Sequence, residues 1–286
     1  MSSAITHNNL NHWQAGGQFI SVAEHKIFTR VIGQGKPILM LHGFPTASFD
    51  YVRLVPLLED GFRLVLLDFL GFGFSDKPAQ HTYSLFEQAD IVQAVANHYG
   101  IERATVVTHD MGNSVTLEIL RRGQLEIEKL VMLNGSVLLR YYRPLMTQRL
   151  LLNPLTGPLI TRFHLINRNT FARQFGSLFA HFPPDEEIDA FWSLIRHNNG
   201  MDIYHLLIRY LNERKLHEYD WLDALQVHQV PLTLIWGQRD PVSVPKIAEA
   251  VLERRPDAIY VPLADVSHYP HWELPEQVAQ VIREQL

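Results

Sequence analysis

The chain has 286 residues, 47% of them hydrophobic and 19% charged, which suits one large globular domain with room for an insertion. Its net charge of −5 offers no basic surface to nucleic acid or to an anionic membrane, and the lack of cysteine excludes disulfides, thiolate metal sites and a cysteine nucleophile. Residues 1–18 lack a signal pattern, and no apolar run approaches the ~18 residues that span a bilayer. We therefore expect a soluble, cytoplasmic protein, whose oligomeric state the sequence leaves open.

Strand-like and helix-like segments alternate through the first half of the chain and again near its end. The strands are expected over residues 19–22, 27–32, 37–41, 63–67, 103–108, 127–133, 231–237 and 258–262. The helices are expected over residues 49–58, 84–98, 111–122 and 245–255, and from residue 275 onward. Continuous apolar strands separated by helices predict an α/β fold with a mostly parallel sheet flanked by helices.

The alternation breaks between residues 136 and 223, where helical runs interrupted by prolines replace the buried strands. This pattern predicts a helical cap inserted after the sixth strand, over the carboxyl edge of the sheet where open α/β sheets bind ligands. The expected division is a first part of the core over residues 1–135, the cap over 136–223 and a second part of the core over 224–286. The aromatic residues of the cap suit a lid that lines an apolar pocket.

A sharp strand-to-helix turn is predicted around Asp110. A strand-like run ends at Thr108, a helical run opens at Met111, and the small residue Gly112 follows the apex, as in a nucleophile elbow. The apex holds an aspartate where this elbow usually holds a serine. The dipole of the following helix favours the ionised carboxylate, which can displace a leaving group at saturated carbon and form a covalent ester. The alternatives are an aspartate that only caps the helix and a nucleophilic Ser114, one full turn inside the helix.

Asp110, Asp240 and His268 each follow an expected strand, in the order nucleophile, acid and base that such an elbow carries. His268 can take a proton near neutral pH from the water that cleaves the ester. Asp240 can fix the tautomer of this histidine and stabilise its imidazolium form. These three residues are the predicted catalytic residues.

The turn His42-Gly43-Phe44-Pro45 follows the first buried strand, at the ligand-binding edge of the expected sheet. Its rigid geometry makes the backbone N–H of Phe44 a candidate oxyanion donor, with the N–H of Met111 as its partner. His42 is placed among the expected substrate-binding residues because it begins this turn.

Neither a cofactor nor a metal is predicted. The pair Gly71-Phe-Gly73 follows a strand, but Asp76 stands where a dinucleotide fingerprint has its third glycine, so we interpret the segment as a bent loop. The histidines show no spacing typical of metal ligands, since a proline-containing loop separates His268 from His271. The expected partner is a small apolar substrate, with no nucleic acid and no membrane.

Four motifs together resemble the α/β-hydrolase superfamily. They are His42-Gly-Phe-Pro45, the segment 68–78, His109-Asp110-x-Gly112 and Ser267-His268-Tyr-Pro270. Within it they resemble the branch of epoxide hydrolases and haloalkane dehalogenases, and most of all the hydrolases similar to the mesoderm-specific transcript protein. This likeness extends over residues 83–88, 133–135, 143–145 and 210–214. The resemblance implies an α/β-hydrolase fold and the catalytic roles given above.

Two positions differ from the dehalogenase pattern. Haloalkane dehalogenases place a tryptophan after the nucleophile and usually an asparagine after His-Gly, whereas this chain has Met111 and Phe44. Trp192 of the cap remains as a candidate substitute that would contact the substrate. Epoxide hydrolases carry His-Gly-x-Pro, as here, and cap tyrosines that hydrogen-bond the epoxide oxygen. Tyr210 is the first candidate for this role. The second stays open among Tyr142, Tyr204 and Tyr219.

We therefore expect a hydrolase that acts through a covalent alkyl-enzyme ester, most like an epoxide hydrolase acting on a small apolar substrate. The alternatives are a haloalkane dehalogenase, an ester or lactone hydrolase and, as the weakest, a ligand-binding relative without turnover.

Overall fold

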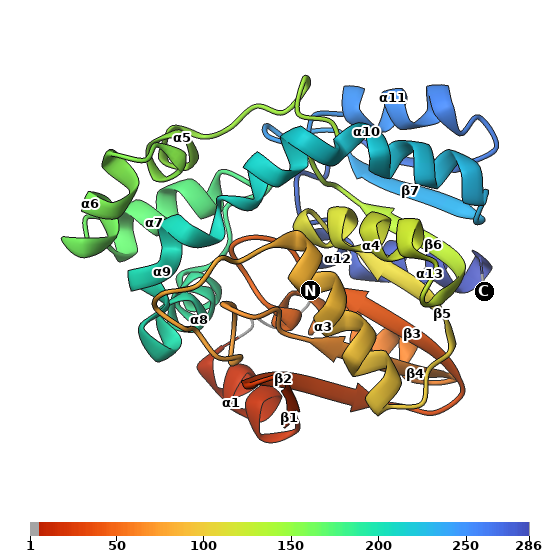
Figure 1. Cartoon of the computed structure of the whole chain (residues 1–286), viewed down its shortest axis with the longest axis horizontal. Helices are drawn as coiled ribbons and strands as arrows, with labels where there is room; N and C mark the ends of the chain where they lie inside the picture. Colours follow the sequence, from red (N-terminus) through yellow and green to blue (C-terminus); the bar gives the residue numbers. More distant parts are fainter. Residues whose placement is uncertain (1–5, 286) are drawn as a thin grey trace.

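An eight-stranded sheet runs through the centre of the protein (Figure 1); the computed structural model describes residues 6–285. The strands are β1 (Gln18–Val22), β2 (His25–Ile32), β3 (Lys36–Leu41), β4 (Phe62–Leu67), β5 (Arg103–Thr108), β6 (Glu126–Leu133), β7 (Leu232–Gly237) and β8 (Ile259–Leu263). Their order in the sheet is β1-β2-β4-β3-β5-β6-β7-β8. Only β1–β2 and β2–β4 pair antiparallel, which confirms the mostly parallel sheet.

Helices cover both faces of the sheet. They are α1 (His7–Ala15), α2 (Val55–Leu58), α3 (Leu85–His98), α4 (Met111–Arg122), α5 (Met146–Leu152), α6 (Thr156–Arg162), α7 (Arg168–Gly176), α8 (Asp185–Arg196), α9 (Gly200–Leu207), α10 (Tyr210–His228), α11 (Lys246–Arg254), α12 (Pro270–Glu273) and α13 (Pro275–Gln285). In Figure 1, α3 and α4 lie in front of the sheet and α12 and α13 lie behind it. Because both faces are covered, every residue of β7 and the last four of β3 are buried, which explains their continuous apolar sequence.

Two elements differ from the sequence-based expectation. The helix expected over residues 49–58 is a 3₁₀ turn, η1 (Ser48–Tyr51), followed by the short α2. Pro56 lies in the first turn of α2, the part of a helix that tolerates proline, so a helix cannot continue through it from η1. The N-terminal α1 was not predicted, because its sequence is mostly polar. Its buried Leu10 and Trp13, three residues apart on one face, are the signal that could have revealed it.

The helices α5–α10, with the short 3₁₀ turn η2 (His197–Asn199), join β6 to β7 and confirm an insertion after the sixth strand. We call residues 136–229 the helical insertion. Figure 1 shows α5–α9 gathered at one end of the strands, while α10 runs from this group back across the molecule, above α4, toward α11. Within residues 6–285, no helix has both the length and the apolar character needed to cross a membrane.

Candidate active site

The turn between β5 and α4 carries Asp110 at its apex. Asp110 has φ 44° and ψ −108°, a conformation that is costly for any residue with a side chain. Its backbone N–H donates to the carbonyl of Asn134 at 2.9 Å, and its own carbonyl accepts from the N–H of Asn113 at 3.2 Å. The backbone therefore holds the strained residue on both sides and presents its side chain at the end of the sheet.

Two glycines make room for Asp110. A Cβ placed on Gly43 would lie 2.5 Å from the Cβ of Asp110, and one on Gly135 would lie 2.9 Å from its Cα. Any side chain at either position would therefore displace the apex residue. Gly135 was not predicted as a site residue, although the Asn134-Gly135 pair at the end of an expected strand is a signal for it.

One oxygen of the Asp110 carboxylate is engaged and the other is not. The backbone N–H of Phe44 donates to Oδ2 at 3.1 Å, whereas Oδ1 has no hydrogen-bond partner in the described part of the chain. Phe44, the predicted oxyanion donor, thus lies against the carboxylate. Met111 is the first residue of α4, so its N–H has no acceptor within the helix. Its role as the second donor stays a prediction.

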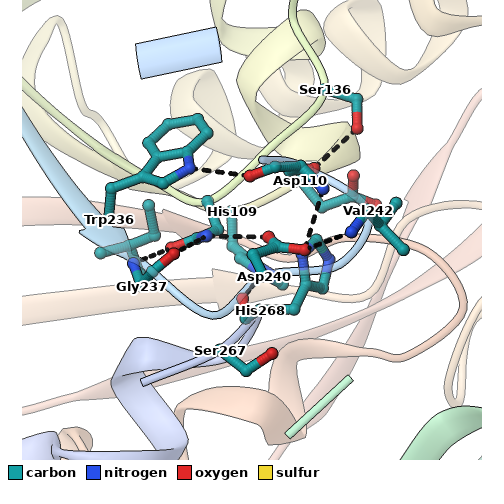
Figure 2. Close-up of polar contacts among 12 residues, drawn as sticks. His109, Asp110, Ser136, Trp236, Gly237, Asp240, Val242, Ser267 and His268 are labelled. Carbon is teal, nitrogen blue, oxygen red and sulfur yellow. Dashed lines mark hydrogen bonds and ion pairs between the residues drawn. The ribbon is translucent and has the colours of Figure 1, made fainter. Parts of the chain in front are cut away.

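Asp240, in the turn after β7, is hydrogen-bonded at both oxygens (Figure 2). Its Oδ1 accepts from the backbone N–H groups of Val242 and Ser243, each at 2.8 Å. Its Oδ2 accepts from the side-chain amide of Asn134 at 2.8 Å and from Nδ1 of His268 at 2.6 Å. Burial opposes the charge of Asp240, but the charge of His268 and these hydrogen bonds outweigh it and lower the pKa of this carboxyl group.

His268, in the loop after β8, has only Nε2 left to exchange a proton, because Nδ1 is bonded to Asp240. Its backbone N–H donates to the carbonyl of Leu178 in the helical insertion at 2.9 Å, which ties the loop in place. Burial lowers the pKa of His268, but the charges of Asp240 and Asp110 outweigh it, so that the pKa is raised. His109, the residue before Asp110, donates Nε2–H to the carbonyl of His268 at 2.8 Å, which holds the loop of the histidine beside the turn of Asp110.

His42 has a different place from the one expected. Its ring is buried, with Nδ1–H donating to the carbonyl of Gly43 at 2.8 Å and Nε2 accepting from the N–H of Phe69 at 3.0 Å. Both ring nitrogens are therefore used within the protein, and burial lowers the pKa of His42 to about 3. We correct the substrate-binding assignment: this neutral histidine connects the turn after β3 to the loop after β4.

The four candidate tyrosines differ in where they lie relative to Asp110. Burial raises the pKa of the phenols of Tyr210 and Tyr142, and the negative charge of Asp110 raises both further. The hydroxyl of Tyr142 donates to Gln148 of α5 at 2.9 Å. Tyr204 stacks on Phe44 with 5.3 Å between ring centres. Tyr219 is 49% exposed on the outer side of α10, away from the other three, so it is not the second tyrosine.

A small pocket, open to solvent, lies between the helical insertion and the turn after β3. Phe44 of the turn and Tyr204, Phe171 and Leu178 of the helical insertion line it, whereas Asp110 and His268 are not among its lining residues. Trp192 is not among the lining residues, because its ring packs on Phe171 with 5.2 Å between centres. Trp192 therefore supports the wall of this pocket, and its contact with substrate stays a prediction.

Arg214 of α10 is a site residue that reasoning from the sequence did not identify as one. Its side chain is fully buried, with Nε donating to the Ser114 hydroxyl at 2.9 Å and Nη2 to the Asp110 carbonyl at 3.4 Å. The guanidinium carbon lies 4.8 Å from the ring centre of Tyr210. Nη1 has no hydrogen-bond partner, and no ion pair between Arg214 and a carboxylate is found in residues 6–285.

Two groups of side chains in the described residues bring possible metal ligands within 4.8 Å of one another. They are His25, His81 and Glu87, and the buried group Asp50, His109 and His271. Chain spacing could not reveal either group in full, since each has at least one member from a distant segment. In the buried group, Nε2–H of His109 donates to the carbonyl of His268 at 2.8 Å, and the two rings lie 4.8 Å apart. This group therefore lies directly beside the candidate base.

Comparison with known proteins agrees with the fold. A family model described as alpha/beta hydrolase fold matches residues 36–275. The putative hydrolase LipZ of Mycobacterium tuberculosis is 40% identical over 284 residues, covering 96% of this chain and 97% of that protein. The mesoderm-specific transcript homolog protein of Homo sapiens is 36% identical over 284 residues, covering 93% of this chain and 84% of that protein.

A third relative is named after haloalkane dehalogenation, one of the two activities compared in the sequence analysis. Haloalkane dehalogenase 2 of Mycobacterium tuberculosis is 26% identical over 263 residues, covering 88% of each chain. The resemblance inferred from the motifs is confirmed by these matches, and the chain belongs to the α/β-hydrolase family.

Proposed function

We propose that the protein is a hydrolase whose nucleophile is Asp110 and whose reaction passes through a covalent alkyl ester of that residue. One observation carries the proposal: the carboxylate stands at the apex of a strained elbow with Oδ2 bonded to the N–H of Phe44 and Oδ1 free. This arrangement leaves one oxygen to attack while the other is already placed beside a donor that stabilises an oxyanion.

The reaction then has two steps. In the first, a lone pair of Oδ1 forms a bond to a saturated carbon of the substrate, and the bond from that carbon to its leaving atom breaks. In the second, Nε2 of His268 takes a proton from water as its oxygen adds to the ester carbonyl, and the oxyanion forms at the Phe44 N–H. The tetrahedral intermediate releases the product alcohol, which takes the proton back from His268.

An epoxide is the substrate class that two tyrosines support. Tyr210 and Tyr142 come from the helical insertion and lie within the electrostatic influence of Asp110. Because the pKa of each is raised, both phenols stay protonated. The Tyr210 phenol can donate a hydrogen bond to the ring oxygen as it becomes an alkoxide, and the Tyr142 phenol can do so once its O–H turns away from Gln148, to which it donates in this structure. The helical insertion would then act as a cap over a small apolar epoxide, and the product would be a diol.

A haloalkane dehalogenase is the second candidate. It is favoured by the name of the 26% identical relative. It also uses the same nucleophile, acid and base, so the two candidates differ only in the atom that leaves. Release of halide from bromoalkanes without diol formation from epoxides would favour this second candidate.

One turnover in water enriched in ¹⁸O tests the nucleophile. With enzyme in excess over styrene oxide, the first diol should carry ordinary oxygen taken from Asp110, and the peptide holding Asp110 should gain one ¹⁸O. The peptide holding the exposed Asp223 serves as control and should stay unlabelled. Label in the diol and none in Asp110 would contradict the ester, because water would then have attacked the substrate directly.

A further inference from the structure

Arg214 has an unusual environment for a buried cation. A guanidinium that is fully buried is expected to be paired with a carboxylate, because the cost of removing its charge from water is otherwise uncompensated. Here two of its nitrogens hold the start of α4, through the Ser114 hydroxyl and the Asp110 carbonyl. The third, Nη1, is buried without a partner. Among the residues that Arg214 contacts, Ser114, Tyr210 and Asp110, the one that carries a carboxylate is the proposed nucleophile.

The proposed reaction changes the charges around this cation. Before the reaction, the negative charge of the Asp110 carboxylate balances the positive N-terminus of α4 and the positive charge of Arg214. Once Asp110 becomes a neutral ester, its negative charge has moved to the leaving atom of the substrate. The guanidinium is held in place by its other two contacts and keeps its own charge, so a position beside Nη1 favours the anion that forms.

We propose that Arg214 is a catalytic residue that donates a hydrogen bond from Nη1 to the atom that receives the electron pair when Asp110 is alkylated. The inference rests on the proposed function, and the leaving atom it describes is a halide or an epoxide oxygen. The electron pair of the breaking carbon–halogen or carbon–oxygen bond goes to that atom. A halide departs as the anion, and an epoxide oxygen takes a proton from a phenol such as Tyr210 and remains in the product.

This role supplies a donor that the core of the fold lacks. Met111 and Phe44 stand where dehalogenases carry side chains with N–H groups, and neither side chain can donate to a leaving atom. Arg214 reaches the same region from α10, four residues after Tyr210 on the same helical face. Its guanidinium carbon lies 4.8 Å from the centre of the Tyr210 ring, which places the guanidinium beside the candidate proton donor.

The test compares leaving groups in single-turnover alkylation. Wild type, Arg214→Met and Arg214→Lys are mixed with matched 1-iodo-, 1-bromo- and 1-chloroalkanes and with styrene oxide, and the mass of the intact protein follows formation of the adduct. We expect Arg214→Met to slow alkylation by about 10²–10³-fold. The loss should be largest for chloride and smallest for iodide, the better leaving group. Arg214→Lys, which keeps the charge without the fork of donors, should fall between.

Arg255→Met is the matched control, because Arg255 is also a buried arginine, only 2% exposed, but donates to the Leu225 and Val230 carbonyls far from the site. It should lower stability and leave the dependence on leaving group unchanged. Equal alkylation rates in wild type and Arg214→Met would overturn the role of Arg214 alone. An effect confined to KM for substrates that carry a carboxylate would also overturn it, since Arg214 would then anchor the substrate. No adduct in wild type would instead contradict the proposed function.

A second measurement does not depend on the folding of an Arg214 variant. In Asp110→Asn, which mimics the neutral charge of the ester, Arg214 has lost its balancing anion. Sodium bromide should therefore raise the melting temperature of Asp110→Asn by more than it raises that of wild type, relative to the same ionic strength of sodium fluoride. Equal shifts in the two proteins would contradict anion binding at Arg214.

Discussion

The sheet and the helical insertion hold their parts of the site by different means. On the sheet side, Asp110 and Asp240 follow buried strands, and backbone N–H groups bind one oxygen of each carboxylate. On the insertion side, Tyr142 and Arg214 are held through side chains, by Gln148 and by Ser114. A hydrogen bond from a backbone N–H group is kept when the donor residue is substituted, whereas a hydrogen bond from a side chain is lost. The difference therefore suggests that bond making depends on the sheet and the choice of substrate on the insertion.

The largest expected effect tests the sheet side. Asp110→Asn removes the nucleophile and should lower turnover of styrene oxide by at least about 10⁴-fold, with no adduct in the intact mass. Asp223→Asn, an exposed aspartate of α10, should retain wild-type turnover. Residual activity of Asp110→Asn within tenfold of wild type would show that another group attacks the substrate.

A second change on the sheet side should separate the two steps. His268→Gln leaves the nucleophile intact but removes the base, so alkylation should continue while hydrolysis slows by about 10³-fold. The ester should then accumulate and add the mass of the substrate to the protein. If His268→Gln neither turns over nor accumulates the adduct, the histidine is also required for the first step.

A change on the insertion side should depend on the substrate. Tyr210→Phe removes one donor to the epoxide oxygen and should lower kcat for styrene oxide by about 10²-fold, with Tyr142→Phe giving a similar or smaller loss. Tyr219→Phe is the control, because Tyr219 is exposed. Release of bromide from a bromoalkane should change less than diol formation. Equal losses for both substrates would make Tyr210 a structural residue and weaken the epoxide proposal.

The pH dependence of hydrolysis reports the pair His268–Asp240. The pKa of His268 is raised, and only the neutral imidazole can act as base, so kcat should rise with pH through a value above the ~6.5 of an ordinary histidine. The charge pair also stabilises the folded protein below the pKa of the unfolded state, and this contribution is lost as pH rises through the folded value. In Asp240→Asn, the pH at which kcat rises should be lower than in wild type, and the maximal kcat should also be lower. If the rise of kcat stays at the same pH, a group other than His268 controls it.

The smallest expected effect concerns the wall of the pocket. Trp192→Phe should lower the free energy of unfolding by about 1 kcal/mol, because it removes packing against Phe171. Its kcat and KM should stay at wild-type values, since Trp192 does not line the pocket. Phe171→Leu, which changes the lining itself, should alter KM. Denaturant unfolding and steady-state kinetics check both. A large KM effect for Trp192→Phe would instead place Trp192 among the substrate-binding residues.

The elbow could be predicted from the sequence because its signals are local. An apolar run, a sharp turn and Gly112 all lie within a few residues of Asp110, and the structure places β5 and α4 at the expected bounds. Asn134 was missed as a partner of Asp240, although it ends the neighbouring expected strand. The hydrogen bond between them joins residues 106 positions apart, which local patterns do not reveal.

The insertion could not be predicted in the same detail. Glu213, Arg214 and Lys215 are consecutive charged residues on α10, and only the packing of that helix on α4 shows that the middle one is buried. Trp192 was chosen for its residue type and His42 for its place in a motif. Trp192 packs on Phe171, and His42 accepts a hydrogen bond from Phe69. Both partners come from another segment of the chain, so the sequence alone does not reveal these contacts.

The position of the insertion between β6 and β7 has a consequence for engineering. These strands are parallel neighbours, with Leu130 opposite Leu232, so the chain leaves the sheet at the carboxyl end of β6 and returns to it at the opposite end, where β7 begins. A segment joined at these two points therefore has to include a helix equivalent to α10, which makes the return across the sheet while packed on α4. A chimera that receives residues 136–229 from another family member keeps Asp110, Asp240 and His268 and exchanges Arg214 and Tyr210. We expect such a chimera to take on the substrate selectivity of the family member that supplied the insertion.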